Sequence, residues 1–199
     1  MPENPLSFSR MRSVDDARQL RALTHPVRIA LIETLTVDGP MTATEAAERI
    51  GETPTTCSFH LRQLARFGFV EEAGGGKGRA RPWRMASIGM HMNPVQTDPE
   101  VAVAADAVTR LVRDRQLARY AAWLDTQHGY PTAWREAGDS TELLFWLTPE
   151  ELKDLIGEVH QVLERRLDER LTDPSQRPPG ALPVELLLFA YPMRPPARA

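Results

Sequence analysis

The sequence of 199 residues has a single cysteine, Cys57, and no apolar run as long as a membrane span. One cysteine excludes an intrachain disulfide framework and a zinc ribbon built on several cysteines. A membrane-spanning helix needs about 20 apolar residues, and the longest runs here, 143–149 and 186–193, are far shorter. The first ten residues contain an early acid and no hydrophobic stretch, so we expect no secretion signal. These absences predict a soluble protein in a reducing, cytoplasmic setting.

Patterns typical of catalytic and metal sites are missing as well. The glycine-rich stretch 74–78 lacks the spacer and the following Ser or Thr of a phosphate-binding loop. His160 and Glu164 share a helical face, but two ligands do not make a metal site. Cys57 and His60 have no third group that would orient the imidazole for nucleophilic catalysis. We therefore expect no cofactor, no metal and no enzymatic activity.

What is present is an ordinary globular composition, with 42% hydrophobic and 26% charged residues. The net charge of −3 is unevenly distributed: residues 1–97 carry +2, residues 98–199 carry −5, and residues 53–84 alone carry +4. A local positive region can guide a polyanion to one face of an acidic protein. A solvated surface run explains the same charges equally well.

Helix start and stop signals divide residues 10–97 into short helices. Ser13, with Asp16 in the first turn behind it, predicts the N-cap of the first helix. Pro26 suits the first turn of a second helix, which the run 38–40 (Asp-Gly-Pro) ends.

Two further helices follow with only a few residues between them. A capping box from Thr42 to Glu45 opens the first, which stops at Gly51. Thr53 followed by Pro54 opens the second. Two short helices joined by a glycine-containing turn predict a helix-turn-helix.

A basic hairpin comes directly after this pair of helices. Residues 69–73 and 81–85 are strand-like, and the glycine-rich tip lies between them. Pro82 cannot donate a ladder hydrogen bond, which predicts that the returning strand is bulged or at an edge. A hairpin in this position is a wing.

The second half is expected to form an α+β region with a small antiparallel sheet covered by one helix. After a connector at 87–97, the expected elements are a long helix from Asp98 to about Gln127, strands at 133–137 and 142–147, a capped amphipathic helix at 149–171, a buried strand at 184–191 and a disordered tail at 192–199.

Several short stretches of the first half resemble the ArsR-type winged-helix regulators of bacteria. Residues 22–35 are similar to the opening helix pair of that family, and residues 53–70 to its recognition helix and first wing strand. The best matches are Ser58–Leu61 and Gly68–Val70, and the resemblance covers about residues 14–88. It implies a homodimer in which each protomer lays one helix into the major groove of DNA.

The two faces of the helix at 53–67 agree with this implication. Cys57, Leu61 and Leu64 fall on one stripe and are expected to be buried, while the opposite stripe carries hydroxyls and arginines suited to phosphates and base edges. Arg62 is expected to contact a guanine or a phosphate. The full set of expected DNA-contacting residues is Thr42, Thr53, Thr55, Thr56, Ser58, Phe59, His60, Arg62, Gln63 and Arg66, with Lys77, Arg79 and Arg81 on the wing.

Phe59 departs from the ArsR-type pattern, which more often has a polar residue there. The phenyl ring could press on a thymine methyl group or a deoxyribose. Alternatively, it could pack under the wing.

Most aromatic residues lie in the second half of the chain. They either fill the core of the expected sheet or line a pocket for an apolar effector whose binding would shift the recognition helices. The residues of this expected pocket are Trp123, Tyr130, Trp134, Phe145, Trp146 and Phe189.

Taken together, these patterns predict an α+β, mainly helical protein with a winged helix-turn-helix domain at 10–97 and a dimerising, effector-binding region at 98–199. The expected function is sequence-specific binding of double-stranded DNA by a homodimeric transcriptional regulator, a repressor controlled by a non-metal effector. The alternative is an adaptor that binds protein instead of DNA, through Phe59 and the acidic second half. An enzyme built on 98–199 is disfavoured because no nucleophile motif or carboxylate pair is present.

Overall fold

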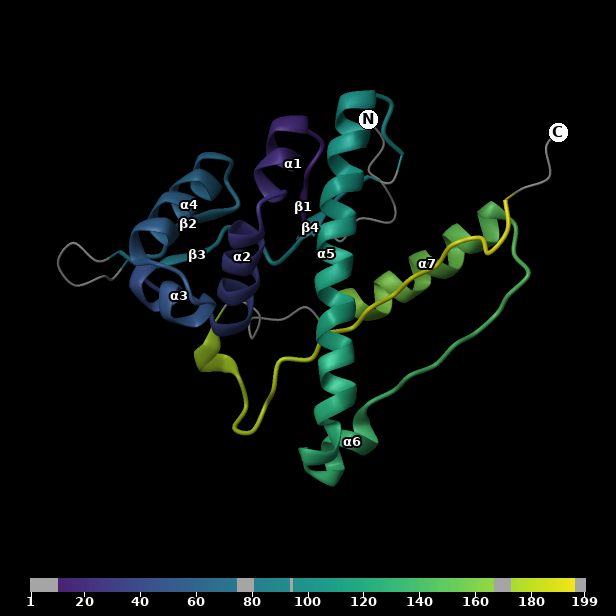
Figure 1. Ribbon diagram of the computed structural model, residues 1–199. Coiled ribbons are helices and arrows are strands. Elements are labelled where there is room, and N and C mark those ends of the chain that lie inside the picture. Colours follow the sequence, from purple (N-terminus) through teal and green to yellow (C-terminus); the bar gives the residue numbers. More distant parts are fainter. Residues whose placement is uncertain (1–10, 75–80, 94, 167–172, 196–199) are drawn as a thin grey trace.

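The computed structural model describes residues 11–74, 81–93, 95–166 and 173–195 (Figure 1). The chain is mainly helical, with a compact group of short helices and strands at its N-terminal end, one long helix, and a second half made of helices and extended segments. This confirms the expected fold class. Among the described residues no helix is both long and apolar enough to cross a membrane.

The first two helices are α1 (Ala17–Leu23) and α2 (Pro26–Asp38). The N-cap of α1 is Asp16, whose carboxylate accepts hydrogen bonds from the backbone N–H groups of Arg18 and Gln19. The expectation that Ser13 caps this helix is therefore wrong. Ser13 lies instead in a short strand, β1 (Arg12–Ser13).

The expected helix-turn-helix is confirmed as α3 (Ala43–Ile50) and α4 (Pro54–Arg66). The capping box of α3 is complete, because the Thr42 hydroxyl accepts from the backbone of Glu45 and the Glu45 carboxylate accepts from the backbone of Thr42. Gly51 ends α3 with a φ of 73°, a left-handed conformation that favours glycine.

The wing is a hairpin of β2 (Val70–Glu72) and β3 (Trp83–Met85), paired antiparallel. In this two-stranded sheet β3 is an edge strand, as expected, apart from one isolated bridge. Trp83 pairs with Glu72 of β2 on one side. On its other side it exchanges two backbone hydrogen bonds with Met41, at 3.0 and 2.8 Å. Pro82 is tolerated because it lies just before the paired residues, where its carbonyl accepts from the N–H of Ala73.

The connector expected at 87–97 contains a strand, β4 (Met90–His91), which pairs parallel with β1. Strands of two residues carry no periodicity, so the pattern along the chain could not show them.

A single hydrophobic core holds these elements together. Its largest fully buried side chains come from α1, α2, α4, β2 and the long helix, together with Val14 after β1 and Phe69 before β2. They are Val14, Leu20, Leu23, Leu31, Cys57, Leu61, Leu64, Phe69, Val70 and Val108.

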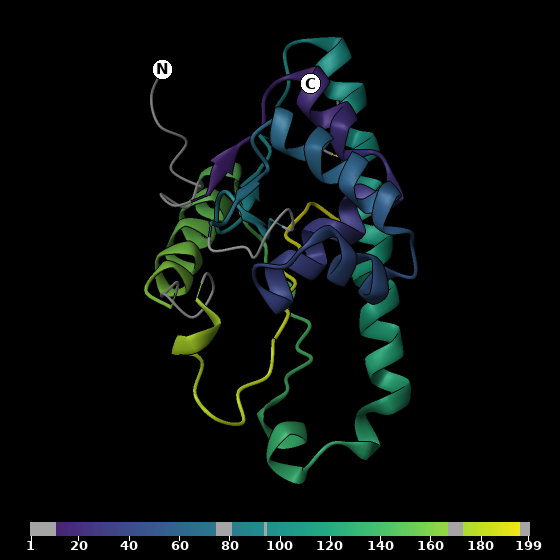
Figure 2. The same ribbon diagram turned by 90° about the vertical axis from the view of Figure 1, so that its left-hand side faces the viewer.

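The long helix is α5 (Pro99–Thr126), capped by Asp98 as expected. Its buried residues, Val101, Ala104, Ala105 and Val108, all lie in its first half, where the helix packs on the core. The remainder of α5 extends past the small helices, as Figures 1 and 2 show.

The three strands expected in the second half are not formed. Residues 133–137 lie within a short helix, α6 (Thr132–Ala137), while 142–147 and 184–191 have neither helix nor ladder. The five residues 133–137, Ala-Trp-Arg-Glu-Ala, are mostly good helix formers placed after Pro131, and this local preference prevails. The only antiparallel sheet of the described residues is the hairpin of the wing.

The second capping box is confirmed at the start of α7 (Pro149–Glu164), where Thr148 and Glu151 exchange hydrogen bonds. The helix was expected to reach residue 171, but it ends at Glu164, and residues 167–172 lie outside the described part. Its apolar stripe is only half-buried, since no residue of α7 is fully covered. The expected disordered tail is described only as far as residue 195.

Candidate nucleic-acid interface

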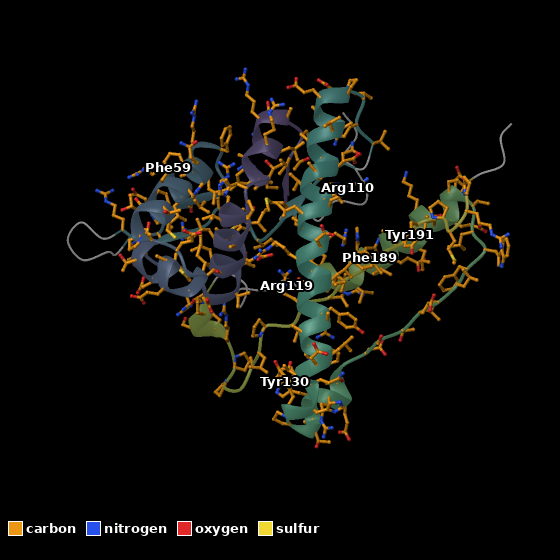
Figure 3. The ribbon with its side chains drawn as sticks, in the orientation of Figure 1. Phe59, Arg110, Arg119, Tyr130, Phe189 and Tyr191 are labelled. Atoms are coloured by element: carbon orange, nitrogen blue, oxygen red, sulfur yellow. The ribbon has the colours of Figure 1, made fainter. Side chains whose placement is uncertain are left out.

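The two faces of α4 differ as the sequence predicts. Cys57, Leu61 and Leu64 are completely buried against the other helices of the core. The opposite face is open to solvent, and Figure 3 shows Phe59 on the side of α4 that points away from α5. Its exposed members are Thr55, Phe59, Arg62 and Arg66, with Ser58 and Gln63 half-buried beside them.

Arg62 is the least constrained cation on this face. It makes no hydrogen bond or ion pair with any residue that the structure describes, and its side chain is exposed. Arg66, one turn further on, lies over the ring of Phe67 with 5.9 Å between guanidinium and ring centroid. A free guanidinium keeps all of its donors for a ligand such as a phosphate or the acceptor edge of guanine.

The threonines at the helix starts mainly position the helices. The Thr53 hydroxyl accepts from the backbone N–H of Thr56 at 3.1 Å and lies 2.8 Å from the Thr56 hydroxyl. The Thr42 hydroxyl is likewise bonded to Glu45. Thr55 remains exposed, so it is the first hydroxyl of α4 that is free to meet a ligand.

His60 does not belong to the exposed face. Its side chain is 8% exposed, and its ring lies 4.3 Å from that of His25, the N-cap residue of α2. Burial lowers the pKa of His60, and the nearby His25 and Arg28 lower it further. A neutral, enclosed imidazole cannot reach DNA in this conformation, so we leave His60 out of the interface.

The environment of Phe59 bears on its two alternative roles. The ring is 51% exposed and meets the ring of His60 edge-on at 5.1 Å between centroids. This exposure favours contact with a ligand over packing beneath the wing.

The wing carries less free positive charge than its sequence suggests. Arg81 is paired with Glu72 at 2.5 Å, and Arg84 with Glu71 at 2.7 Å. The hydrogen bond to Glu72 raises the pKa of the Arg81 guanidinium, which therefore stays charged. These pairs are exposed and hence weak, so a phosphate can compete for either arginine. Lys77 and Arg79 lie outside the described residues.

An ionic network that the sequence did not reveal ties the recognition domain to α5. The Glu33 carboxylate on α2 accepts hydrogen bonds from Arg115 at 2.5 Å and from Arg119 at 2.6 Å. Arg119 also pairs with Glu185 at 2.6 Å. The partners are more than 60 residues apart in the chain, and no local pattern marks such contacts.

The structure does not gather the six aromatic residues of the expected effector pocket. Trp123 stacks on Tyr120 at 5.9 Å, and Phe189 lies under the guanidinium of Arg113 at 4.2 Å. Trp146 is 91% exposed. Tyr130, Phe145 and Phe189 are also exposed, Trp123 and Trp134 half-buried, and Figure 3 shows Tyr130 and Phe189 at different levels along α5. These six side chains therefore do not form the expected cluster within the part of the chain that the structure describes.

Metal ligands do not gather either. Within the described ranges, no three His, Cys, Asp or Glu side chains come together in a way that could hold an ion.

Comparison with known proteins agrees with the geometry of the first half. Residues 23–73 match a protein-family model described as a helix-turn-helix domain. No curated protein matches the chain.

Among solved structures, the chain is similar to a homodimeric winged helix-turn-helix DNA-binding domain from Mycobacterium bovis, described as a possible ArsR-family transcriptional regulator. The identity is 26%, and the match covers 51% of this chain and 80% of that one. The TM-score of 0.33 is too low for this likeness to support a common arrangement over the matched length. The family match and the observed elements do agree: residues 23–73 are a helix-turn-helix domain, which the hairpin of β2 and β3 extends into a winged helix.

Proposed function

We propose that this protein is a homodimeric transcriptional regulator that binds specific sequences of double-stranded DNA through α4. The observation that carries the proposal is the open face of α4, on which Arg62 has no partner among the described residues and is flanked by exposed Thr55 and Phe59. The major groove of B-DNA is about 12 Å wide and admits one helix. Arg49, Arg81 and Arg84 of this domain are paired with acids, whereas the unpaired guanidinium of Arg62 on an exposed helix face suits a polyanionic ligand.

Each side chain of the open face has a distinct role in this proposal. Arg62 contacts a guanine or a phosphate, and Thr55 and Ser58 contact phosphates or base edges near the helix start. Phe59 presses on a thymine methyl group or a sugar. The wing follows the neighbouring backbone and contributes affinity and salt dependence more than choice of sequence.

An exposed face of α5 supports the homodimer in this proposal. Exposed residues recur along it at alternating intervals of four and three, which is the spacing of a helix that packs against another helix. They are Val103, Ala107, Arg110, Asp114, Leu117, Ala121 and Leu124, here called the α5 stripe. Val103 alone is 72% exposed. We propose that the α5 stripe is the dimer contact.

The α5 stripe is complementary to itself. Around a two-fold axis between Arg110 and Asp114, two antiparallel copies would place each Arg110 opposite the partner subunit's Asp114. The same symmetry sets Ala107 against Leu117 and Val103 against Ala121, so small side chains meet large ones. An isologous contact of this kind needs no third component.

We further propose that the dimer represses transcription by occluding a promoter and that a non-metal effector releases it. Two recognition helices must match half-sites about one DNA turn, roughly 34 Å, apart. The network of Glu33 with Arg115 and Arg119 links α2 directly to α5, so a tilt of one α5 helix against the other would move α4 as well.

The test is footprinting of the purified full chain across the region upstream of its own gene, together with binding measured at several salt concentrations. We expect a protected, two-fold symmetric site and an affinity that falls steeply as salt rises. Absence of any salt-sensitive affinity for duplex DNA would overturn the proposal and would favour the protein-binding adaptor, which exposed Phe59 and the acidic second half support.

A further inference from the structure

Two stretches of the second half have no backbone pairing partner among the residues that the structure describes. Residues 142–147 (here the first extended segment) and residues 184–191 (the second extended segment) run without helix or ladder. Among the described residues, no backbone hydrogen bond joins either segment to another part of the protein. Their large apolar side chains are exposed: Leu143, Leu144, Phe145, Trp146 and Leu147 in the first, and Val184, Leu186, Leu188, Phe189 and Tyr191 in the second.

This state is unfavourable for an isolated chain. Contiguous apolar surface of this extent marks an interaction site in a soluble protein. An extended backbone with free N–H and C=O groups is at the same time a template for pairing with another strand. Both segments are rich in Leu, Phe and Tyr or Trp, residues that suit a partly buried sheet.

The second extended segment is nevertheless held in a definite place. Glu185 is bound by Arg119 through two hydrogen bonds of 2.6 and 3.2 Å, and Phe189 lies under Arg113 at 4.2 Å. Both anchors are on α5. Figure 1 shows this segment passing α5 and then following α7.

The two segments have the arrangement of parallel strands joined by a crossover helix. The first leads into α7, and the second follows it after a loop. Figure 1 shows them running in the same direction on the same side of α5, without lying against each other. A strand–helix–strand connection normally ends in a sheet, yet here the ladder between its two strands is absent.

We propose that the two extended segments pair with the same segments of a second copy of this chain, forming one sheet shared by two protomers. This inference rests on the homodimer proposed above and names a second contact for it. The anchor Arg113 is adjacent to the centre of the α5 stripe, between Arg110 and Asp114. Joining two α5 helices there brings both copies of the second extended segment to the two-fold axis, where symmetry makes them antiparallel, an orientation in which strands pair readily.

A second copy also explains the scattered aromatic residues. Phe145, Trp146 and Phe189 lie on the extended segments and are exposed in one chain. In a shared sheet, the consecutive residues Phe145 and Trp146 would point to opposite faces, so that α5 would cover one face and α7 the other.

The test uses the full-length protein in dimers assembled from two differently labelled chains, one with 15N and one with 13C. Filtered nuclear Overhauser spectra report contacts between chains, and amide hydrogen exchange reports whether the segment N–H groups are bonded. We expect contacts between chains at both extended segments and slow exchange of their amides. Fast exchange in a protein that sediments as a dimer would overturn the shared sheet and leave the dimer contact of α5 intact.

Two other outcomes also count against the inference. Slow exchange with contacts only inside one chain would show that the segments pair within the protomer. A monomer throughout would overturn the shared sheet and the proposed homodimer together, while DNA binding is judged separately by footprinting.

A pair of proline variants gives an independent readout. Leu186→Pro removes one ladder N–H from the second extended segment but disturbs no hydrogen bond seen in a single chain. We expect it to weaken dimerisation at least tenfold in sedimentation equilibrium. Met193→Pro, equally exposed but beyond the segment, is the control and should leave dimerisation unchanged. If Leu186→Pro and Met193→Pro change the strength of dimerisation to the same extent, the shared sheet is contradicted.

Discussion

At the scale of single residues, Arg62 is the side chain whose loss should alter DNA binding most. It is exposed on α4 and has no partner among the described residues. If Arg62 reads a base, Arg62→Ala should weaken binding to the specific site by about 1–3 kcal/mol, on the order of ten- to a hundredfold in affinity. Gel-shift titrations on the footprinted site and on random DNA measure this loss.

The matched control for this variant is Arg135→Ala. Arg135 is an exposed arginine on α6, at the far end of α5 from the recognition helix, so the control makes the same change of charge without touching the interface. An equal loss of affinity on specific and random DNA would assign Arg62 to a phosphate. No loss at all would remove it from the interface.

His60 is the residue that should make the stability of the domain depend on pH. Its pKa is lowered by burial and then by His25 and Arg28, while Glu52 acts in the opposite direction. In the unfolded chain a histidine takes up its proton near its ordinary pKa of about 6.5, whereas folded His60 stays neutral to a lower pH. Between the lowered pKa of folded His60 and the ordinary pKa of the unfolded chain, the unfolded state binds more protons. Stability is therefore lost as the pH falls from the higher of these two values to the lower.

Denaturant unfolding of the wild type and of His60→Gln between neutral and mildly acidic pH tests this prediction. We expect the variant to lose part of the pH dependence. His91 has a pKa lowered by burial as well, so His91→Gln is needed to separate the two contributions. Unchanged pH dependence in His60→Gln would show that His60 titrates alike in both states.

At the scale of elements, the start of α4 depends on one cap. The Thr53 hydroxyl accepts from the N–H of Thr56, and removing such a cap costs about 1 kcal/mol. Thr53→Ala should lower the free energy of unfolding by that amount in urea titrations. Thr55→Ala, on the exposed part of the same turn, should change it by less than about 0.5 kcal/mol. Similar losses in the two variants would argue against a specific capping role.

The α5 stripe makes a prediction about charge. If Arg110 faces the partner subunit's Asp114, Arg110→Asp creates two repulsive contacts in each dimer and should raise the fraction of monomer. Adding Asp114→Arg to the same chain restores opposite charges and should recover the dimer. Sedimentation equilibrium of the single and double variants measures this effect, with Asp106→Lys, an exposed change off the stripe, as the control. If the double variant does not recover the dimer, the proposed pairing of Arg110 with the partner subunit's Asp114 is excluded.

At the scale of the whole molecule, Glu33 joins the recognition domain to the long helix. Burial raises the pKa of this carboxyl, but hydrogen bonds and charge from Arg115 and Arg119 outweigh burial and hold the pKa below its ordinary value. Glu33→Gln leaves both arginines without their shared partner and should lower the free energy of unfolding by about 1–2 kcal/mol. Because the folded carboxyl has the lower pKa, this stabilisation is present at neutral pH and is lost as the solution becomes acidic.

Glu185→Gln is the comparison, since it removes only the more exposed pair with Arg119 and should cost less than about 1 kcal/mol. Unfolding titrations of the two variants at neutral and acidic pH separate the contributions. Equal small losses would show that the contact of α2 with α5 depends on apolar packing alone.

Much of the winged helix could be predicted because its signals are local. The caps at Thr42 and Thr53, the proline after Thr53 and the glycine at residue 51 act on backbone groups within one turn. The buried stripe of α4 follows from helical periodicity in the same way. Burial of His60 was missed because it depends on the folded domain, in which the ring meets His25 from 35 residues earlier in the chain.

The second half was harder because strands need partners that the local pattern does not identify. The apolar stretches at 142–147 and 184–191 have the composition of strands, but a ladder forms only where a second backbone lies alongside, and the described residues of one chain do not supply it.

The sequence alone therefore determined where α2, α3, α4, α5 and α7 begin, which face of α4 is apolar and which cations lie opposite, since each depends on neighbours a few residues away. Only the tertiary structure decided that β1 pairs with β4, that Glu33 joins α2 to α5, that Arg81 is paired while Arg62 is free, and that the two extended segments remain open. Those outcomes depend on groups far apart in the chain, whose approach is set by the packing of the whole molecule.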